Sequence, residues 1–99
     1  MKQRPVAKVV VDPKLGLLVM PHLVGRGSYE MIYREANGLR WERERQALHA
    51  YEPSRWESCE LLRHIAATLR DACDEELFFT PDTVWEGVSL ELKRALAES

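Results

Sequence analysis

The chain has 99 residues, of which 45% are hydrophobic and 30% are charged, and its formal net charge is −2. This length predicts a single domain over residues 1–99, too small to enclose a large cofactor. The strands and helices predicted below make it an α+β domain. No apolar run reaches the roughly 18 residues of a membrane span, and no signal-peptide pattern opens the chain. We expect a cytoplasmic protein without a cofactor, a membrane partner or a nucleic-acid partner.

The charges are unevenly divided between the two halves of the chain. Residues 1–49 carry nine Lys and Arg against five Asp and Glu, which gives +4, whereas residues 50–99 carry five against eleven, which gives −6. Such asymmetry would attract two layers of one fold to each other or favour self-association, and the basic half is too weakly charged to indicate nucleic acid.

Two apolar, β-branched runs near the start predict a first hairpin. They are Pro5–Val11 and Leu17–Met20, and the intervening Asp12–Gly16 has the Pro and Gly of a turn. The second run is continuously apolar, so we expect it to be central and covered on both faces. Residues 21–28 are then predicted to be an irregular connection.

The segment Tyr29–Glu35 alternates with a period of two, which predicts a strand. A three-residue loop over 36–38 would place Tyr33 opposite Trp41 and gather the aromatic side chains on one face. Leu39–Tyr51 is open to two interpretations, because it is rich in helix formers but leaves a predicted turn as a strand. We interpret it as two short strands with Glu42–Arg45 as their turn.

The stretch Ser54–Asp74 has the pattern of an amphipathic helix. Ser54 and Glu57 have the spacing of a capping box, and Pro53 precedes them. The apolar arc consists of Cys59, Leu61, Leu62, Ile65, Ala66, Leu69, Ala72 and Cys73. The two cysteines are about 21 Å apart along such a helix, so we expect buried, inert thiols that do not bond to each other.

The C-terminal quarter predicts one more strand and one more helix. Glu76–Thr80 is a β-prone run that ends at Pro81, as an edge strand would. Trp85 is expected in a loop, and Ser89 is expected to cap a last helix that ends at Glu98. The predicted fold is an antiparallel β-meander of about five to six strands, packed on one face by two helices.

Four short segments are spaced as in a known group of proteins: Gly38–Trp41, Glu52–Trp56, Leu62–Ile65 and Thr80–Trp85. Over roughly residues 30–90 the chain resembles small bacterial hypothetical proteins carried on mobile integron gene cassettes. The resemblance implies a small α+β protein, often self-associating, with no established catalytic residues.

The histidines and cysteines offer little chemistry in this pattern. Glu60 and His64 stand at i, i+4 and could orient an imidazole, but both lie in the polar arc, where a solvated surface pair is favoured. Cys59 lies on the apolar arc, away from His64, so the two cannot form a nucleophilic dyad. Gly25–Ser28, with Arg26, could cradle an anion, but a plain turn loop is favoured. We assign no catalytic residue and no metal site.

Trp56 is the residue that fits its surroundings least. It falls in the polar arc over Glu60 and Arg63, where the pattern predicts solvent. Either another segment of the chain covers it, which we favour, or it belongs to a partner surface, since Trp and Arg are over-represented in binding hot spots.

The leading hypothesis is therefore a non-enzymatic binding or interaction protein that forms a homo-oligomer, with a dimer expected, or binds a protein partner. Its candidate surface residues are Trp56, Trp41, Tyr51, Arg63 and Arg26.

Two other functions stay open. A small-ligand-binding protein or enzyme would need a cleft between sheet and helices, drawing on His49, His64, Arg26 or Tyr33. An antitoxin or immunity protein would use the acidic second half against a basic partner.

Overall fold

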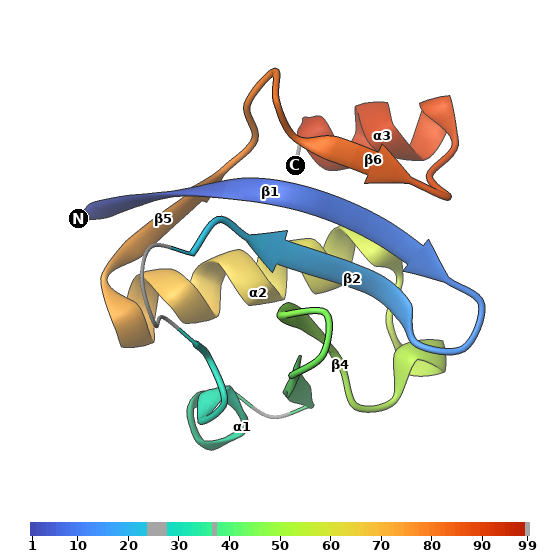
Figure 1. Cartoon of the computed structure of the whole chain (residues 1–99). Helices are drawn as coiled ribbons and strands as arrows, with labels where there is room; N and C mark the ends of the chain where they lie inside the picture. The colour runs from blue at the N-terminus through green and yellow to red at the C-terminus, as the bar shows by residue number, and fades with distance from the viewer. Residues whose placement is uncertain (24–27, 37, 99) are drawn as a thin grey trace.

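The computed structural model describes residues 1–23, 28–36 and 38–98. It shows an open six-stranded sheet with three α-helices and one 3₁₀ turn (Figure 1). In chain order the elements are β1 (Lys2–Asp12), β2 (Gly16–Pro21), α1 (Ile32–Glu35), β3 (Leu39–Glu42), β4 (Ala47–Ala50), η1 (Pro53–Arg55), α2 (Ser58–Cys73), β5 (Glu75–Phe78), β6 (Val84–Glu86) and α3 (Leu90–Ala97).

The long strand β1 is the centre of the sheet. It pairs antiparallel with β2, which confirms the predicted first hairpin, and parallel with both β5 and β6. The strand order is β3-β4-β2-β1-β5, with β6 also on β1. The predicted antiparallel meander is therefore wrong for the last two strands, because α2 carries the chain across the sheet before β5 begins.

The strands β5 and β6 pair with successive parts of β1. Between them, the buried Thr83 hydroxyl donates a hydrogen bond of 2.6 Å to the Val6 carbonyl oxygen. This contact holds the intervening segment against β1 where backbone pairing is interrupted. Trp85, expected in a loop, consequently lies in β6.

The strand β2 is covered on both faces, as its continuous apolar run predicted. Leu17 and Val19 belong to the main core with α2, whereas Leu18 packs on the other face with Val10 and Ala47. The β3–β4 turn reaches β1, where Arg45 Nη1 lies 3.2 Å from Asp12 Oδ1.

The hairpin of β3 and β4 confirms the two predicted strands in Leu39–Tyr51. Its turn lacks Gly, Pro and Asn, and two features replace them. The Glu42 carboxylate accepts hydrogen bonds from the backbone N–H groups of Glu44 and Arg45, at 3.3 and 2.6 Å. Gln46 takes a positive φ of 54°. A carboxylate thus supplies the turn chemistry that glycine or asparagine usually supplies.

The predicted strand Tyr29–Glu35 is wrong, because this segment contains the one-turn helix α1. The buried residues in and next to this segment are Tyr29, Ile32 and Ala36, of which Ile32 lies in α1, and their spacing is i, i+3, i+7. The predicted pairing of Tyr33 with Trp41 is wrong as well. Trp41 pairs with Leu48, and the Tyr29 ring meets the Trp41 ring edge-on at a centroid distance of 5.4 Å.

The helix α2 begins later than predicted. Ser54 lies in the 3₁₀ turn, and Glu57 is the N-cap, since its carboxylate accepts from the N–H groups of Cys59 and Glu60. These hydrogen bonds lower the pKa of Glu57. The predicted apolar arc packs into the core through four buried residues: Leu61, Leu62, Ile65 and Leu69.

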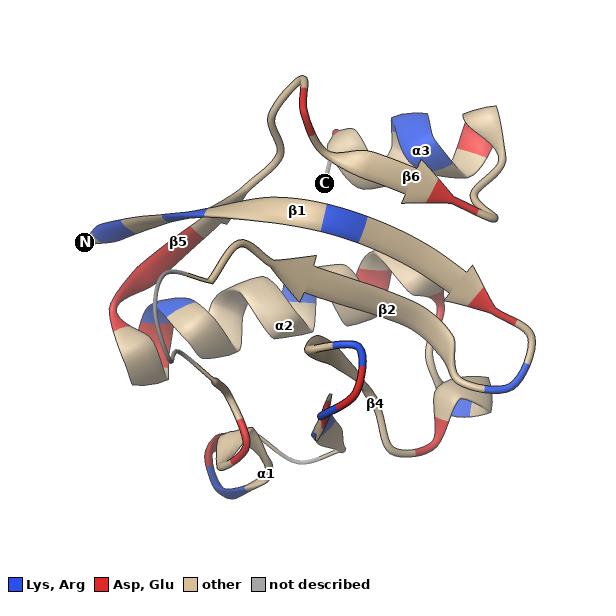
Figure 2. Ribbon diagram, in the orientation of Figure 1, with Lys and Arg blue, Asp and Glu red and all other residues tan. Residues whose placement is uncertain are grey.

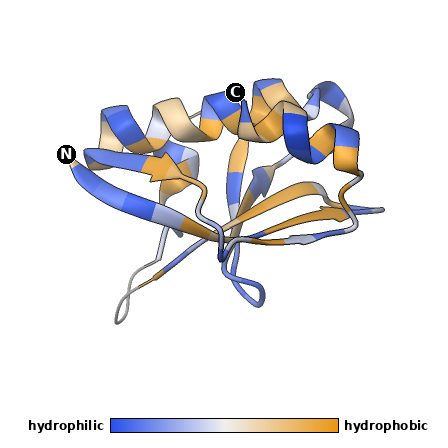
Figure 3. Ribbon diagram, turned by 90° about the horizontal axis from the view of Figure 1, so that it is seen from above, coloured by the Kyte–Doolittle hydropathy of each residue, from blue (hydrophilic) through white to orange (hydrophobic). Residues whose placement is uncertain are grey.

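The ends of the helical layer differ from the prediction in detail. Cys59 is partly buried but Cys73 is exposed at the end of α2, and both thiols are free. Ser89 caps α3 as predicted, and Leu96 is buried, whereas Ala95 is exposed. Both α2 and α3 lie on the same side of the sheet (Figure 3). In the described part of the chain, no helix has both the length and the apolar character needed to cross a membrane.

The two oppositely charged halves of the chain are interleaved in the sheet. Figure 2 shows the basic start of β1 beside the acidic start of β5. Arg4 pairs with Glu75 at 2.5 Å, and Lys8 pairs with Glu86 at 3.2 Å. Ion pairs between the basic first half and the acidic second half of the chain therefore join β1 to β5 and β6.

Candidate functional site

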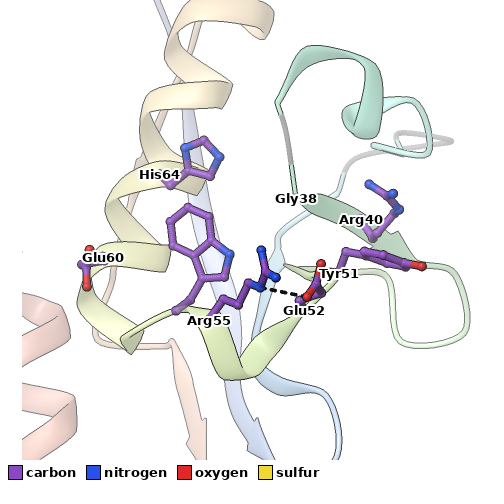
Figure 4. A pocket seen from close by; sticks show the side chains of 8 residues that line it. Gly38, Arg40, Tyr51, Glu52, Arg55, Glu60 and His64 are labelled. Atoms are coloured by element: carbon purple, nitrogen blue, oxygen red, sulfur yellow. Dashed lines mark ion pairs between the residues drawn. The ribbon is translucent and has the colours of Figure 1, made fainter.

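A cleft of about 630 Å³ lies between the open end of the β3–β4 hairpin and the start of α2 (Figure 4). Its lining residues come from the hairpin end, the η1 turn and the first half of α2: Gly38, Arg40, Tyr51, Glu52, Arg55, Trp56, Glu60 and His64. Among these lining residues, the formal charges of the two arginines and the two glutamates cancel.

The hairpin end brings distant parts of this lining together. The Tyr51 N–H donates to the Gly38 carbonyl oxygen at 2.7 Å, which extends the pairing of β3 with β4 by one residue. Gly38 has a φ of +84°, a conformation that side-chain-bearing residues rarely adopt. The η1 turn then carries the chain to Trp56, whose extended backbone leads into α2.

One wall of the cleft is formed by Trp56 and His64. Their rings stack with a centroid distance of 4.9 Å and an interplanar angle of 13°. The indole edge faces Gly38, since a Cβ placed on Gly38 would lie 3.8 Å from Trp56 Nε1 and Cζ2. Trp56 is partly buried against the main core. It is therefore partly covered by its own chain and partly available at the cleft.

The opposite wall is formed by Tyr51 and Arg40. The Arg40 guanidinium lies 4.5 Å from the centroid of the Tyr51 ring and 5.8 Å from that of Tyr33. Its Nη1 also donates to the Leu39 carbonyl oxygen at 2.8 Å. Tyr51 is 62% exposed and Tyr33 is 47% exposed. We call the row Tyr33, Arg40, Tyr51 and Trp56 the aromatic strip.

Two of the charges at the rim form an ion pair. Arg55 Nε lies 2.9 Å from Glu52 Oε2, an exposed ion pair drawn in Figure 4. His64 lies on the cleft side of α2 (Figure 4), and Glu60, one turn earlier on the same helix, is exposed and also lines the cleft. The sequence predicted a surface pair of His64 with Glu60, and the structure adds a stack of His64 on Trp56. The cleft thus has aromatic faces and a rim whose formal charges balance.

The structure brings together two of the five predicted surface residues, Tyr51 and Trp56. Trp41 lies on β3 against Tyr29, and Arg63 lines a different hollow. The prediction for Arg26 lies outside the described residues.

Of the other candidates, Tyr33 joins the strip through Arg40. His49 lies on β4 outside the cleft, with Nδ1 3.0 Å from the Ala50 carbonyl oxygen, and burial lowers its pKa. Sequence reasoning missed Arg40 and Gly38. The hairpin register could have found Gly38, because it pairs Leu39 with Ala50 and so sets Gly38 opposite Tyr51.

A buried polar cluster lies away from the cleft. Glu75 accepts hydrogen bonds from Arg4 Nε and Nη2 at 3.2 and 2.5 Å and from the Tyr29 hydroxyl at 2.5 Å. Arg4 Nη1 also donates to the His22 carbonyl oxygen at 2.9 Å. Burial and the neighbouring Glu75 raise the pKa of Tyr29 well above its ordinary value. These contacts tie β1, β5 and the segment before α1 to one carboxylate, which is a structural role.

Within residues 1–23, 28–36 and 38–98, no three His, Cys, Asp or Glu side chains come together as metal ligands would.

The relationship of the chain to known proteins rests on one solved structure. No protein-family model and no curated protein matches the chain. The integron cassette protein Hfx_Cass5, from the mobile metagenome of the North West Arm sewage outfall, is 31% identical over 99% of this chain and 95% of its own, with a TM-score of 0.45. On this sequence identity, which extends over nearly the full length of both, the chain belongs to the integron cassette proteins. The predicted resemblance is confirmed.

Proposed function

We propose that the chain is a non-enzymatic interaction protein that self-associates as a dimer through the aromatic strip. The observation that carries this proposal is that Tyr33, Arg40 and Tyr51 adjoin one another and face Trp56 across the cleft. Arg40 lies over both tyrosine rings, and Arg40, Tyr51 and Trp56 line one cleft. Tyr, Trp and Arg are the residue types most enriched in binding hot spots.

The charge balance of the cleft supports a second copy as the partner. In a two-fold symmetric dimer the same patch faces itself, so a patch with a large charge of one sign would repel its copy. Here Arg55 is paired with Glu52, and Arg40 lies over Tyr51. Two such patches could approach without net repulsion, with the guanidinium of one copy near the aromatic rings of the other.

The exposure of the strip supports a protein surface over an enclosed ligand. Ligand sites usually bury most of their ligand, whereas Tyr51 is 62% exposed and Glu52 and Arg55 are also exposed. A small-ligand function is a second candidate, favoured by a cleft volume within the usual range of about 300–1,000 Å³ and by the presence of His64 in the lining.

The test uses Trp56 as a reporter of whether the cleft is covered. A variant with Trp41→Phe and Trp85→Phe leaves Trp56 as the single tryptophan, and acrylamide quenching is measured while the protein concentration is raised. We expect quenching of Trp56 to decrease with concentration as the partner copy covers it. The same background with Tyr51→Ala should show a much smaller decrease.

Constant quenching, with a single species throughout, would contradict self-association through this surface. If quenching instead decreases when small molecules are added to dilute, monomeric protein, the small-ligand function is supported in its place.

A further inference from the structure

A second hollow, of about 280 Å³, lies among α2, β5 and the end of α3, apart from the aromatic strip. Its walls come from β1, both helices and the segment that contains β5: Val6, Leu62, Arg63, Ala66, Leu77, Phe78, Phe79 and Ala97. All of these described lining residues are apolar except Arg63. Polar atoms of Arg63 and of the backbone line the hollow as much as the apolar side chains do. Its single positive charge distinguishes it from the cleft, where the formal charges balance.

Arg63 is placed to receive an anion at the rim of this hollow. It is exposed on α2, and the ion pairs formed among the described residues do not include it. The pKa of Glu57, the N-cap of the same helix, is lowered mainly by hydrogen bonds from the N–H groups of Cys59 and Glu60 and to a smaller extent by the Arg63 charge. By contrast, Arg70, two turns further along α2, is paired with Glu76 at 3.4 Å.

We propose that this hollow binds an aliphatic monoanion, namely a medium-chain carboxylate. The alkyl chain would lie against Leu62, Ala66 and Phe78, which is 36% exposed, and the carboxylate would meet the Arg63 guanidinium. Arginine presents paired N–H donors that match the two oxygens of a carboxylate. Burial of the chain removes apolar surface of both ligand and protein from water.

The size and charge of the hollow narrow the class of ligand. A water molecule takes about 30 Å³ in the liquid. A hollow of about 280 Å³ therefore holds at most about nine groups of that size. A neutral hydrocarbon would leave Arg63 unused. A phosphate ester would bring a second negative charge, and the described lining holds no second cation.

The experiment compares octanoate with 1-octanol as probes, with binding followed by calorimetry or by ligand-observed NMR. We expect wild-type protein to bind octanoate at least about tenfold more tightly than 1-octanol, a tenfold ratio being about 1.4 kcal/mol. Arg63→Met keeps the aliphatic stem but removes the charge, so it should abolish this preference. Arg70→Met, a matched change on the same helix, should preserve it.

A second variant tests the apolar part of the hollow. Ala66→Phe should fill it and weaken both probes, with folding checked by circular dichroism. The proposal is overturned if wild-type protein binds neither probe, if it binds both equally, or if Arg63→Met retains the preference for octanoate. Tyr51→Ala should leave octanoate binding unchanged, so the outcome does not depend on the function proposed for the strip.

Discussion

The indole of Trp56 stacks on the imidazole of His64, with ring centroids 4.9 Å apart and planes within 13° of each other. Because this stack also packs against the main core, Trp56 contributes to stability as well as to the cleft surface. Tyr51, on the opposite wall, is 62% exposed and belongs mainly to the surface. Loss of the Trp56 side chain should therefore lower the stability of the fold, whereas loss of the Tyr51 side chain should mainly change the surface.

We expect Trp56→Ala to lower the free energy of unfolding by about 2 kcal/mol, from lost burial and lost stacking. Tyr51→Ala should change it by less than about 0.5 kcal/mol, as exposed substitutions usually do. Urea unfolding of dilute protein measures both. Trp56→Phe should recover part of the loss, because a ring still faces His64. If Trp56→Ala lowered the free energy of unfolding no more than the small change expected for Tyr51→Ala, Trp56 would not be a structural residue.

The Glu75 carboxylate should contribute far more to the stability of the fold than a glutamate in an exposed ion pair does. It is 6% exposed and serves two partners, so Glu75→Gln leaves the Arg4 charge without its counter-ion. We expect a loss of about 3 kcal/mol in the free energy of unfolding, typical of a broken buried pair. The matched control is Glu76→Gln, which breaks the exposed pair with Arg70 and should cost less than about 1 kcal/mol. Similar costs for the two variants would contradict the assigned role of Glu75.

The same carboxylate should make stability depend on acid pH. Burial alone would raise the pKa of Glu75, but hydrogen bonds from Arg4 and Tyr29 outweigh it, and the folded-state pKa lies below the ordinary value. The stabilisation is then complete above the unfolded-state pKa of about 4.3 and is lost as the pH falls below it toward the folded-state pKa.

We therefore expect the unfolding free energy of wild-type protein to fall more steeply below about pH 4.3 than that of Glu75→Gln. The pKa values of Asp12 and Glu57 are also lowered, but these groups are present in both proteins. Unfolding curves at a series of pH values measure the difference. Parallel pH profiles for the two proteins would count against a charged, hydrogen-bonded Glu75.

Gly16 should tolerate no side chain. Its φ is +73°, and a Cβ there would lie 2.9 Å from the Pro53 Cβ, at the contact between the first hairpin and the η1 turn. We expect Gly16→Ala to cost about 2 kcal/mol, from backbone strain together with steric overlap. Gly38→Ala has the strain of a φ of +84° but only ordinary contacts, so it should cost less. Thermal unfolding of both variants measures which substitution lowers stability more.

Local patterns predicted much of the fold. The turn residues at Asp12–Gly16 and the continuous apolar run after them are found as the hairpin of β1 and β2 and its coverage on both faces. The segment Tyr29–Glu35 was misread because two periods coexist in it. Tyr29, Met31 and Tyr33 alternate, but Tyr29, Ile32 and Ala36 have the helical spacing that the structure uses. Seven residues are too few to separate these periods.

Other features depended on contacts between distant residues. The parallel pairing of β5 and β6 with β1 follows from the path of the chain after α2, which no local pattern encodes. The start of α2 was misplaced because Ser54 and Glu57 have capping-box spacing, whereas Glu57 itself caps the helix. In the site, Tyr51 and Trp56 were predicted, but Arg40 was not, since its position between two tyrosine rings requires α1 beside β3.

The central claim is that the aromatic strip joins two copies of the chain. Sedimentation velocity between about 1 and 500 µM, a range that spans typical weak to moderate association, tests it most directly. We expect wild-type protein to shift from monomer to dimer, Tyr51→Ala to weaken association at least about tenfold, and Leu90→Ala, an equally exposed position on α3, to behave as wild type. A monomer at every concentration, or a dimer that Tyr51→Ala leaves unchanged, would contradict the claim.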